Sequence, residues 1–107
     1  MSLTQIKNYQ ISFNLVTNDA ATLTVSKANS TIIQTTTASV YTFPAAASYP
    51  GYTFNLVTQF AGAVTSASSN VVPLAGGAAG TAILAATAGK WATVQSNGTN
   101  WVIIAAN

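Results

Sequence analysis

Few side chains in this chain could take part in acid–base, nucleophilic or metal chemistry. Only 4% of its 107 residues are charged, namely Lys7, Lys27, Lys90 and Asp19, and it has no His and no Cys. Paired-carboxylate catalysis needs two acids, and a hydroxyl nucleophile needs a base beside it. A Ser–Lys pair would satisfy the second need, but no motif surrounds any of the lysines. We therefore expect a protein that is not an enzyme and uses no metal or cofactor.

The sequence does not favour nucleic acid or a membrane as a partner. Three dispersed lysines make no basic patch. The Gly-rich segment 76–80 is followed by Thr81, whereas a phosphate-binding loop continues with Lys, so we interpret it as a connection. The most apolar window, 71–88, contains Pro73 and three Gly and is too broken to span a bilayer. The first residues lack a signal-peptide pattern, which indicates synthesis in the cytoplasm.

The elements that must position any binding residues are strands, because apolar and polar residues alternate in short runs. These runs are 11–17, 22–26, 31–36, 39–43, 52–60 and 63–72. The first two flank an Asn-Asp turn signal and together predict a hairpin. We expect a small all-β fold: an antiparallel β-sandwich or barrel, jelly-roll-like, closed by a C-terminal hairpin. Residues 1–107 would form one β domain, with 1–10 as a candidate extended arm.

One pentapeptide occurs twice in the chain. Phe-Asn-Leu-Val-Thr occupies residues 13–17 and again residues 54–58. A duplicated strand-turn-strand unit would explain the repetition, and so would chance similarity in a biased composition. Two copies are too few to indicate a solenoid.

The clearest local signal is a hairpin near the C-terminus. Asn97-Gly98 lies between two β runs, and both residues tolerate the left-handed angles of a tight turn. A two-residue turn would pair Val94 with Trp101 and Trp91 with Ile104, in aromatic–aliphatic cross-strand contacts. A four- or five-residue loop would shift this register.

The remaining aromatic residues have two interpretations. Tyr49 and Tyr52, with other aromatics, could contact a partner or a sugar. Alternatively the aromatics fill the core or a subunit interface, since they supply the largest buried areas in a chain with few other large groups. Tyr49, beside Pro50, is the one we expect to be exposed.

The C-terminal segment also resembles a known class of protein. Residues 89–104, Gly-Lys-Trp-Ala-Thr-Val-Gln-Ser-Asn-Gly-Thr-Asn-Trp-Val-Ile-Ile, are similar to the closing segment of many tailed-phage virion proteins. These include capsid decoration, head-fibre and tail-fibre modules. Residues 81–89 fit the same pattern, so the resemblance covers Thr81 to Ala105, about a quarter of the chain. Residues 1–80 match nothing in that pattern.

The resemblance implies a structural role on a virus particle. Such modules are usually all-β and often trimeric, and they act through contact area on the outside of a virion. It therefore implies a capsid decoration or cement protein, a homotrimer bound to the major capsid protein on the outer capsid surface. Multivalent seating would multiply a weak single contact. The alternative is a receptor- or glycan-binding tip of a head or tail fibre.

Overall fold

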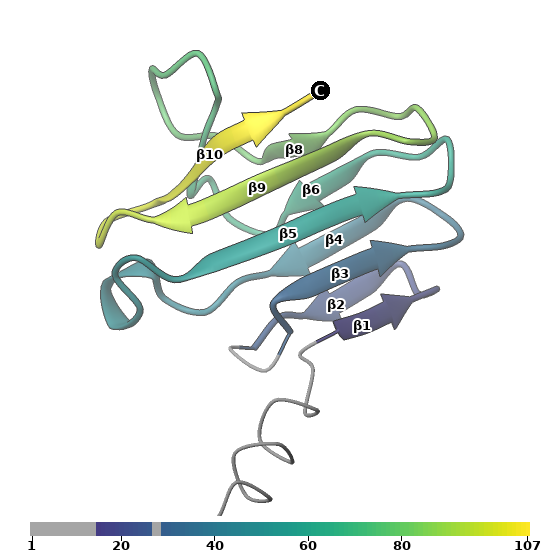
Figure 1. The fold of residues 1–107 in the computed structure, drawn as a ribbon, viewed down its shortest axis with the longest axis horizontal. Helices are drawn as coiled ribbons and strands as arrows, with labels where there is room; N and C mark the ends of the chain where they lie inside the picture. Colours follow the sequence, from purple (N-terminus) through teal and green to yellow (C-terminus); the bar gives the residue numbers. More distant parts are fainter. Residues whose placement is uncertain (1–14, 27–28) are drawn as a thin grey trace, which may run out of the picture.

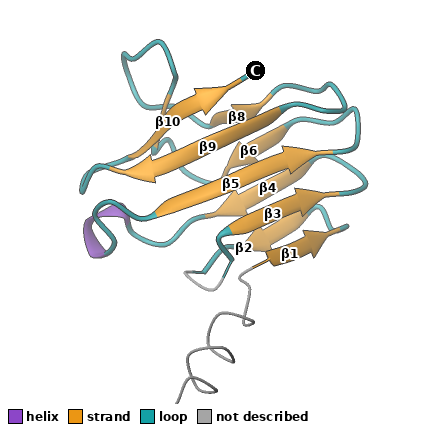
Figure 2. Ribbon diagram, viewed as in Figure 1, coloured by secondary structure: helices purple, strands orange, loops and turns teal. Residues whose placement is uncertain are grey.

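The alternating segments form short strands, and the all-β expectation is confirmed. A computed structural model describes residues 15–26 and 29–107. Its strands are β1 (Leu15–Asn18), β2 (Thr22–Thr24), β3 (Thr31–Gln34), β4 (Ser39–Thr42), β5 (Thr53–Thr58), β6 (Val64–Ser66), β7 (Val71–Val72), β8 (Ala82–Leu84), β9 (Trp91–Ser96) and β10 (Trp101–Ala106). The helical content of the described residues is one 3-10 turn, η1 (Ala46–Ser48; Figure 2). In this part of the chain no helix is long and apolar enough to cross a bilayer.

The strands form two mixed sheets rather than an antiparallel sandwich or barrel. Sheet A has the order β1-β3-β5-β9-β10-β7, and sheet B has the order β2-β4-β6-β8. Figure 1 shows sheet A lying in front of sheet B. Parallel pairs join β1, β3 and β5, and also β2, β4 and β6, whereas β8 and β9 run antiparallel to their neighbours. The prediction of an antiparallel fold was wrong, and neither sheet closes into a barrel.

The parallel pairing arises because the chain changes sheet after almost every strand. It passes from sheet A to sheet B four times, and we call the first three passages, β1–β2, β3–β4 and β5–β6, rungs. The hairpin predicted from 11–17 and 22–26 was therefore wrong, since β1 and β2 lie in different sheets. The predicted strand 63–72 is likewise divided between β6 in sheet B and β7 in sheet A.

In each rung, the chain leaves sheet A beside a buried polar side chain at the end of the strand. The three residues concerned, Asn18, Gln34 and Thr58, are in register across β1, β3 and β5. Each donates to the main-chain carbonyl two residues later: Asn18 Nδ2 to Ala20 (3.0 Å), Gln34 Nε2 to Thr36 (2.7 Å) and Thr58 Oγ1 to Phe60 (2.9 Å). These bonds satisfy backbone groups that leave the ladder where the chain changes sheet.

The core between the sheets is built around aromatic rings. The Phe54 ring lies 5.0 Å from Trp101 and 5.6 Å from Phe43, measured between ring centroids. Trp101 is fully buried, and its indole N–H donates to the Pro44 carbonyl at 3.0 Å. Aromatic pairs at these separations add stabilisation beyond their buried area. The aromatics assigned to the core thus hold the C-terminal hairpin against β4 and β5.

The C-terminal hairpin is present as β9 and β10, but its turn is longer than two residues. The four residues 97–100 connect the strands, and Ser96 opposes Trp101 at the base of the loop. The side-chain oxygen of Asn97 accepts from the backbone N–H groups of Thr99 (2.9 Å) and Asn100 (2.8 Å). Gly98 has a φ of +89°, the left-handed conformation that favours glycine. The Asn-Gly signal therefore located the turn correctly.

The longer loop shifts the pairing, so the predicted partners were wrong. Val94 opposes Ile103 rather than Trp101, and Trp91 opposes Val57 of β5 rather than Ile104. The register of β10 shifts between Ile103 and Ala105, which marks a bulge at Ile104. Ile103 is buried and Ile104 is 49% exposed, as the alternation of side chains along a strand requires.

The described residues of the two pentapeptide copies, 15–17 and 54–58, lie on strands of sheet A that run in the same direction, but they are displaced by one residue. Leu15 of β1 is in register with Thr31 and through it with Asn55, not with Leu56. A displacement of one residue moves a strand's side chains to the other face of the sheet. Leu15 is consequently 53% exposed, whereas Leu56 is 2% exposed. The described residues of the two copies thus share their sequence but neither their register nor their burial.

Candidate functional site

The charged side chains of the described part of the chain form no cluster. Within the described residues, Asp19 is exposed after β1, and Lys90 donates from Nζ to the main-chain oxygen of Asn107 at 3.3 Å. No group of three His, Cys, Asp or Glu that could hold a metal occurs there. Lys7, Lys27 and the candidate arm 1–10 lie outside the described residues. The features of the described chain suited to binding are therefore surfaces and a pocket.

A buried polar network links the two sheets and is structural. The Tyr41 hydroxyl of sheet B donates to Gln34 Oε1 of sheet A at 2.8 Å. Both residues are almost completely buried, and burial raises the pKa of the Tyr41 phenol far above its ordinary value. The described chain has no buried side-chain nitrogen or oxygen without a hydrogen-bond partner. The hydroxyl is thus held neutral, with its proton donated to Gln34.

The two tyrosines expected to contact a partner lie beside the aromatic core. Tyr49 follows η1, Tyr52 precedes β5, and both are half-buried, packed against the core cluster. Their ring centroids are 5.9 Å apart with the planes inclined at 63°. Tyr52 also lies 5.1 Å from Phe54. Tyr49 is less exposed than expected, and contact with a partner stays a prediction.

The other predicted residues, those of the hairpin, divide between the interior and the surface. Val94 and Trp101 are fully buried, whereas Trp91 is 41% exposed and Ile104 is half-exposed. The division follows from the strand period of two, which sends Val94 inward and Trp91 outward on the same strand. Trp91, chosen for a hairpin contact, is instead a large apolar group on the outer face of sheet A.

Trp91 ends a continuous row of side chains across four strands. Thr17 opposes Ile33, Ile33 opposes Val57, and Val57 opposes Trp91. We call Thr17, Ile33, Val57 and Trp91 the outer row. Neighbouring strands lie about 4.8 Å apart, so the row spans about 14 Å. It presents three apolar side chains to the outside of sheet A.

A second row, of small polar side chains, flanks the outer row. Thr31, Asn55 and Thr93 oppose one another on β3, β5 and β9. The Thr93 hydroxyl donates to the Asn55 side-chain oxygen at 2.8 Å, which fixes both side chains on the surface. Neither row contains a charged residue. Together they form an uncharged face in which apolar and hydrogen-bonding groups lie side by side.

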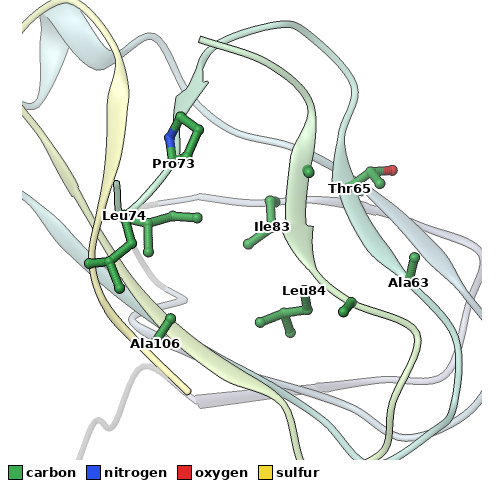
Figure 3. Close-up of a pocket in the computed structure, with 10 residues that line it drawn as sticks. Ala63, Thr65, Pro73, Leu74, Ile83, Leu84 and Ala106 are labelled. Atoms are coloured by element: carbon green, nitrogen blue, oxygen red, sulfur yellow. The ribbon is translucent and has the colours of Figure 1, made fainter. Parts of the chain in front are cut away.

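An apolar pocket opens beside β8, at the opposite edge of the molecule from β1. It has a volume of about 430 Å³ and lies where β8 of sheet B faces β10 of sheet A. Its lining includes Pro73, Leu74, Ile83, Leu84, Ile103 and Ala106. Figure 3 shows Leu74 and Ile83 pointing toward one another across the pocket. Thr65 is the one lining residue with a polar side chain.

The pocket is bordered by the loop that joins β7 to β8. Val71 and Gly80 exchange two backbone hydrogen bonds at its base, and the loop projects beyond β10 (Figure 1). Gly76 and Gly77 have φ values of +86° and +99°, which allow the chain to turn back tightly within this loop. Leu74 of this loop is 56% exposed. A large apolar side chain is therefore held at the mouth of an apolar pocket.

Sequence reasoning did not single out Ile33, Val57 or the pocket. Alternation could assign each residue to a face of its own strand, but it could not show which strands adjoin. No protein-family model, curated protein or solved structure matches the chain. The surface features themselves must therefore carry the functional inference.

Proposed function

We propose that this chain is a structural virion protein, a capsid decoration protein that binds the outer capsid lattice and stabilises the particle without catalytic activity. The observation that carries the proposal is the uncharged face of sheet A. The outer row gives it Ile33, Val57 and Trp91 as contact groups. We further propose the major capsid protein as partner, the outer capsid surface as location and a homotrimer as the bound form.

Attachment through this face is favourable because little opposes its burial. Removing apolar surface from water contributes roughly 25 cal/mol per Å². A charged group in the contact would lose hydration on burial, but the two rows contain none. Trp91 has the size and exposure of a binding hot spot, since tryptophan is enriched among residues that dominate interfaces.

The flanking polar row supports the same role. Interfaces exchange hydrogen bonds with water for hydrogen bonds with the partner. Exposed hydroxyl and amide groups can therefore fix the orientation of a partner without introducing a charge. Thr31, Asn55 and Thr93 supply such groups beside the apolar row. A single contact of this size is weak, and repetition over a capsid lattice multiplies it. The resemblance of residues 81–105 to virion proteins points to the same class of partner.

The proposal is tested by adding the purified chain to bare capsids. These would be assembled from the capsid protein encoded beside this chain in its genome. We expect saturable binding, measured by co-sedimentation, and a higher temperature of capsid disassembly, measured by light scattering. Absence of binding at micromolar concentrations, or binding with no change in that temperature, would count against the proposal.

A glycan-binding tip module is the alternative, and it would rest on Tyr49 and Tyr52. A sugar ring stacks on a flat aromatic face. The two rings are inclined to one another and packed against the core, so they share no flat platform. We therefore favour capsid attachment. Binding to a glycan array that Tyr49→Ala abolishes would reverse this preference.

A further inference from the structure

We propose that the apolar pocket receives residues 11–14 of a neighbouring copy, with Ile11 and Phe13 as the contact groups, so that chains join head to tail. The pocket would thus be completed by a second chain. The proposal does not depend on capsid attachment, because the pocket and the outer row are formed by different residues.

The pocket has the form of a site for an added strand. β8 is the terminal strand of sheet B among the described residues, so one of its edges has no strand partner there. The pocket lies beside this strand and is lined by Ile83 and Leu84 from it. An extended segment can pair with a free strand edge while its alternate side chains fill pockets next to that edge. A volume of about 430 Å³ far exceeds the roughly 10–15 Å³ that admits one water molecule.

The N-terminal sequence has the alternation that such a site requires. Ile11, Phe13 and Leu15 are spaced two residues apart, with Ser12 and Asn14 between them. In any strand that contains all three, they share one face. Leu15 lies on the outer side of sheet A and is half-exposed. Leu15 is thus an exposed apolar group on the outside of sheet A, and the alternation in the sequence continues from it toward the N-terminus.

The reach of the chain places this segment in a second copy. Four strand spacings separate β1 from β10 in sheet A, which is about 19 Å. Two residues of extended chain span about 7 Å and four span about 14 Å. The backbones of Phe13 and Ile11, starting from Leu15, therefore fall short of the pocket of the same molecule. The pocket of a neighbouring molecule can lie next to these residues, because its position is not restricted by the chain length from Leu15.

The chemistry of the two surfaces also agrees. No charged residue lines the pocket, and residues 8–14 contain none. Docking of Phe13 beside Leu74 would cover a leucine that is now more exposed than buried. A contact between the front of one copy and the back of the next is heterologous, and it closes into a ring when the rotation allows. The proposed trimer is one such ring.

Cysteine cross-linking tests the contact directly, because the natural chain has no Cys. Chains carrying Phe13→Cys would be mixed with chains carrying Ala85→Cys or Ala82→Cys and oxidised. We expect a covalent heterodimer with at least one of these partners, and none with Thr22→Cys on β2, at the opposite edge of sheet B from β8. A chain carrying both Phe13→Cys and Ala85→Cys should give multi-chain species on a denaturing gel. A monomer with an internal disulfide, or no disulfide at all, would overturn the proposal.

A matched pair of substitutions tests the apolar face of the segment. Phe13→Asp should weaken self-association at least ten-fold in sedimentation equilibrium, whereas Ser12→Asp should leave it within two-fold. Equal effects of the two substitutions would overturn the proposal. Both variants would also be added to bare capsids. If wild-type chains bound and stabilised capsids as monomers, this inference and the proposed trimer would fail, while capsid attachment would stand. If chains associated through Phe13 but never bound capsids, this inference would stand and capsid attachment would fail.

Discussion

The Asn18 side-chain amide donates to Gln34 Oε1 at 2.8 Å, joining two neighbouring parallel strands inside the protein. The same oxygen accepts the Tyr41 hydroxyl, also at 2.8 Å. Gln34 thus joins β1, β3 and β4 at the corner where the chain changes sheet. Fully satisfied buried networks of this kind define one arrangement of the strands, because any other leaves a polar group without a partner.

Replacement of Gln34 should be strongly destabilising. Gln34→Ala would remove the hydrogen-bond acceptor of both Asn18 and Tyr41 and would leave a cavity. Each unsatisfied buried group costs about 1–3 kcal/mol of folding stability. We expect the free energy of unfolding in urea to fall by about 3 kcal/mol or more. The control is Gln95→Ala, whose side chain makes one exposed hydrogen bond to Gly51; it should change stability by less than about 1 kcal/mol. Similar losses for both would contradict this account of the network.

The Tyr41 phenol should make stability depend on alkaline pH. Burial raises its pKa in the folded state, so the folded protein retains a proton that the unfolded chain loses above about pH 10. Its contribution is complete below pH 10 and is lost as the pH rises further. We expect the advantage of the wild type over Tyr41→Phe, roughly 1 kcal/mol at pH 8, to shrink toward zero by pH 11. Urea unfolding of both proteins across this range measures the difference, and a constant gap would refute the linkage.

The repeated pentapeptide supplies two leucines that should respond differently to the same substitution. Leu56→Ala removes a buried side chain and should lower the free energy of unfolding by about 3 kcal/mol. Leu15→Ala acts on an exposed side chain and should change it by less than about 0.5 kcal/mol in dilute solution. Thermal or urea unfolding at low protein concentration provides the measurement. Comparable losses would contradict the difference in burial between the two leucines.

The conformation of the C-terminal turn predicts an effect of Gly98. Gly98→Ala would place a Cβ where nothing lies within 4 Å, so its cost comes from the positive φ alone. We expect a loss of about 1 kcal/mol in unfolding free energy. Gly80→Ala is the matched control: it too meets nothing within 4 Å, but its φ is not positive, and it should be nearly neutral. A neutral Gly98→Ala would argue for a different turn.

Local features of the fold could be predicted from the sequence because the signals for them are local. Alternation located most of the strands, and the Asn-Gly pair located the turn after Ser96. The capping of that turn by Asn97 uses backbone groups two and three residues away. Burial of Trp101 also follows from the size of its side chain and the period of its strand.

Pairing between distant segments could not be predicted in this way. Thr58 is forty residues from Asn18, yet the two are in register across sheet A, with Gln34 between them. Nothing in residues 15–24 indicates that the chain enters a second sheet instead of folding back as a hairpin. The outer row was hidden for the same reason, because Val57 meets Trp91 only through the pairing of β5 with β9.

The most direct test of the proposed role compares two valine substitutions on opposite faces. Val57→Lys would place a charge in the middle of the outer row, between Ile33 and Trp91. Val40→Lys would place the same charge on the outer face of sheet B, also on a strand with neighbours on both sides. We predict that, in titrations onto bare capsids, Val57→Lys weakens binding at least ten-fold while Val40→Lys matches the wild type. Equal binding by all three proteins would contradict attachment through sheet A.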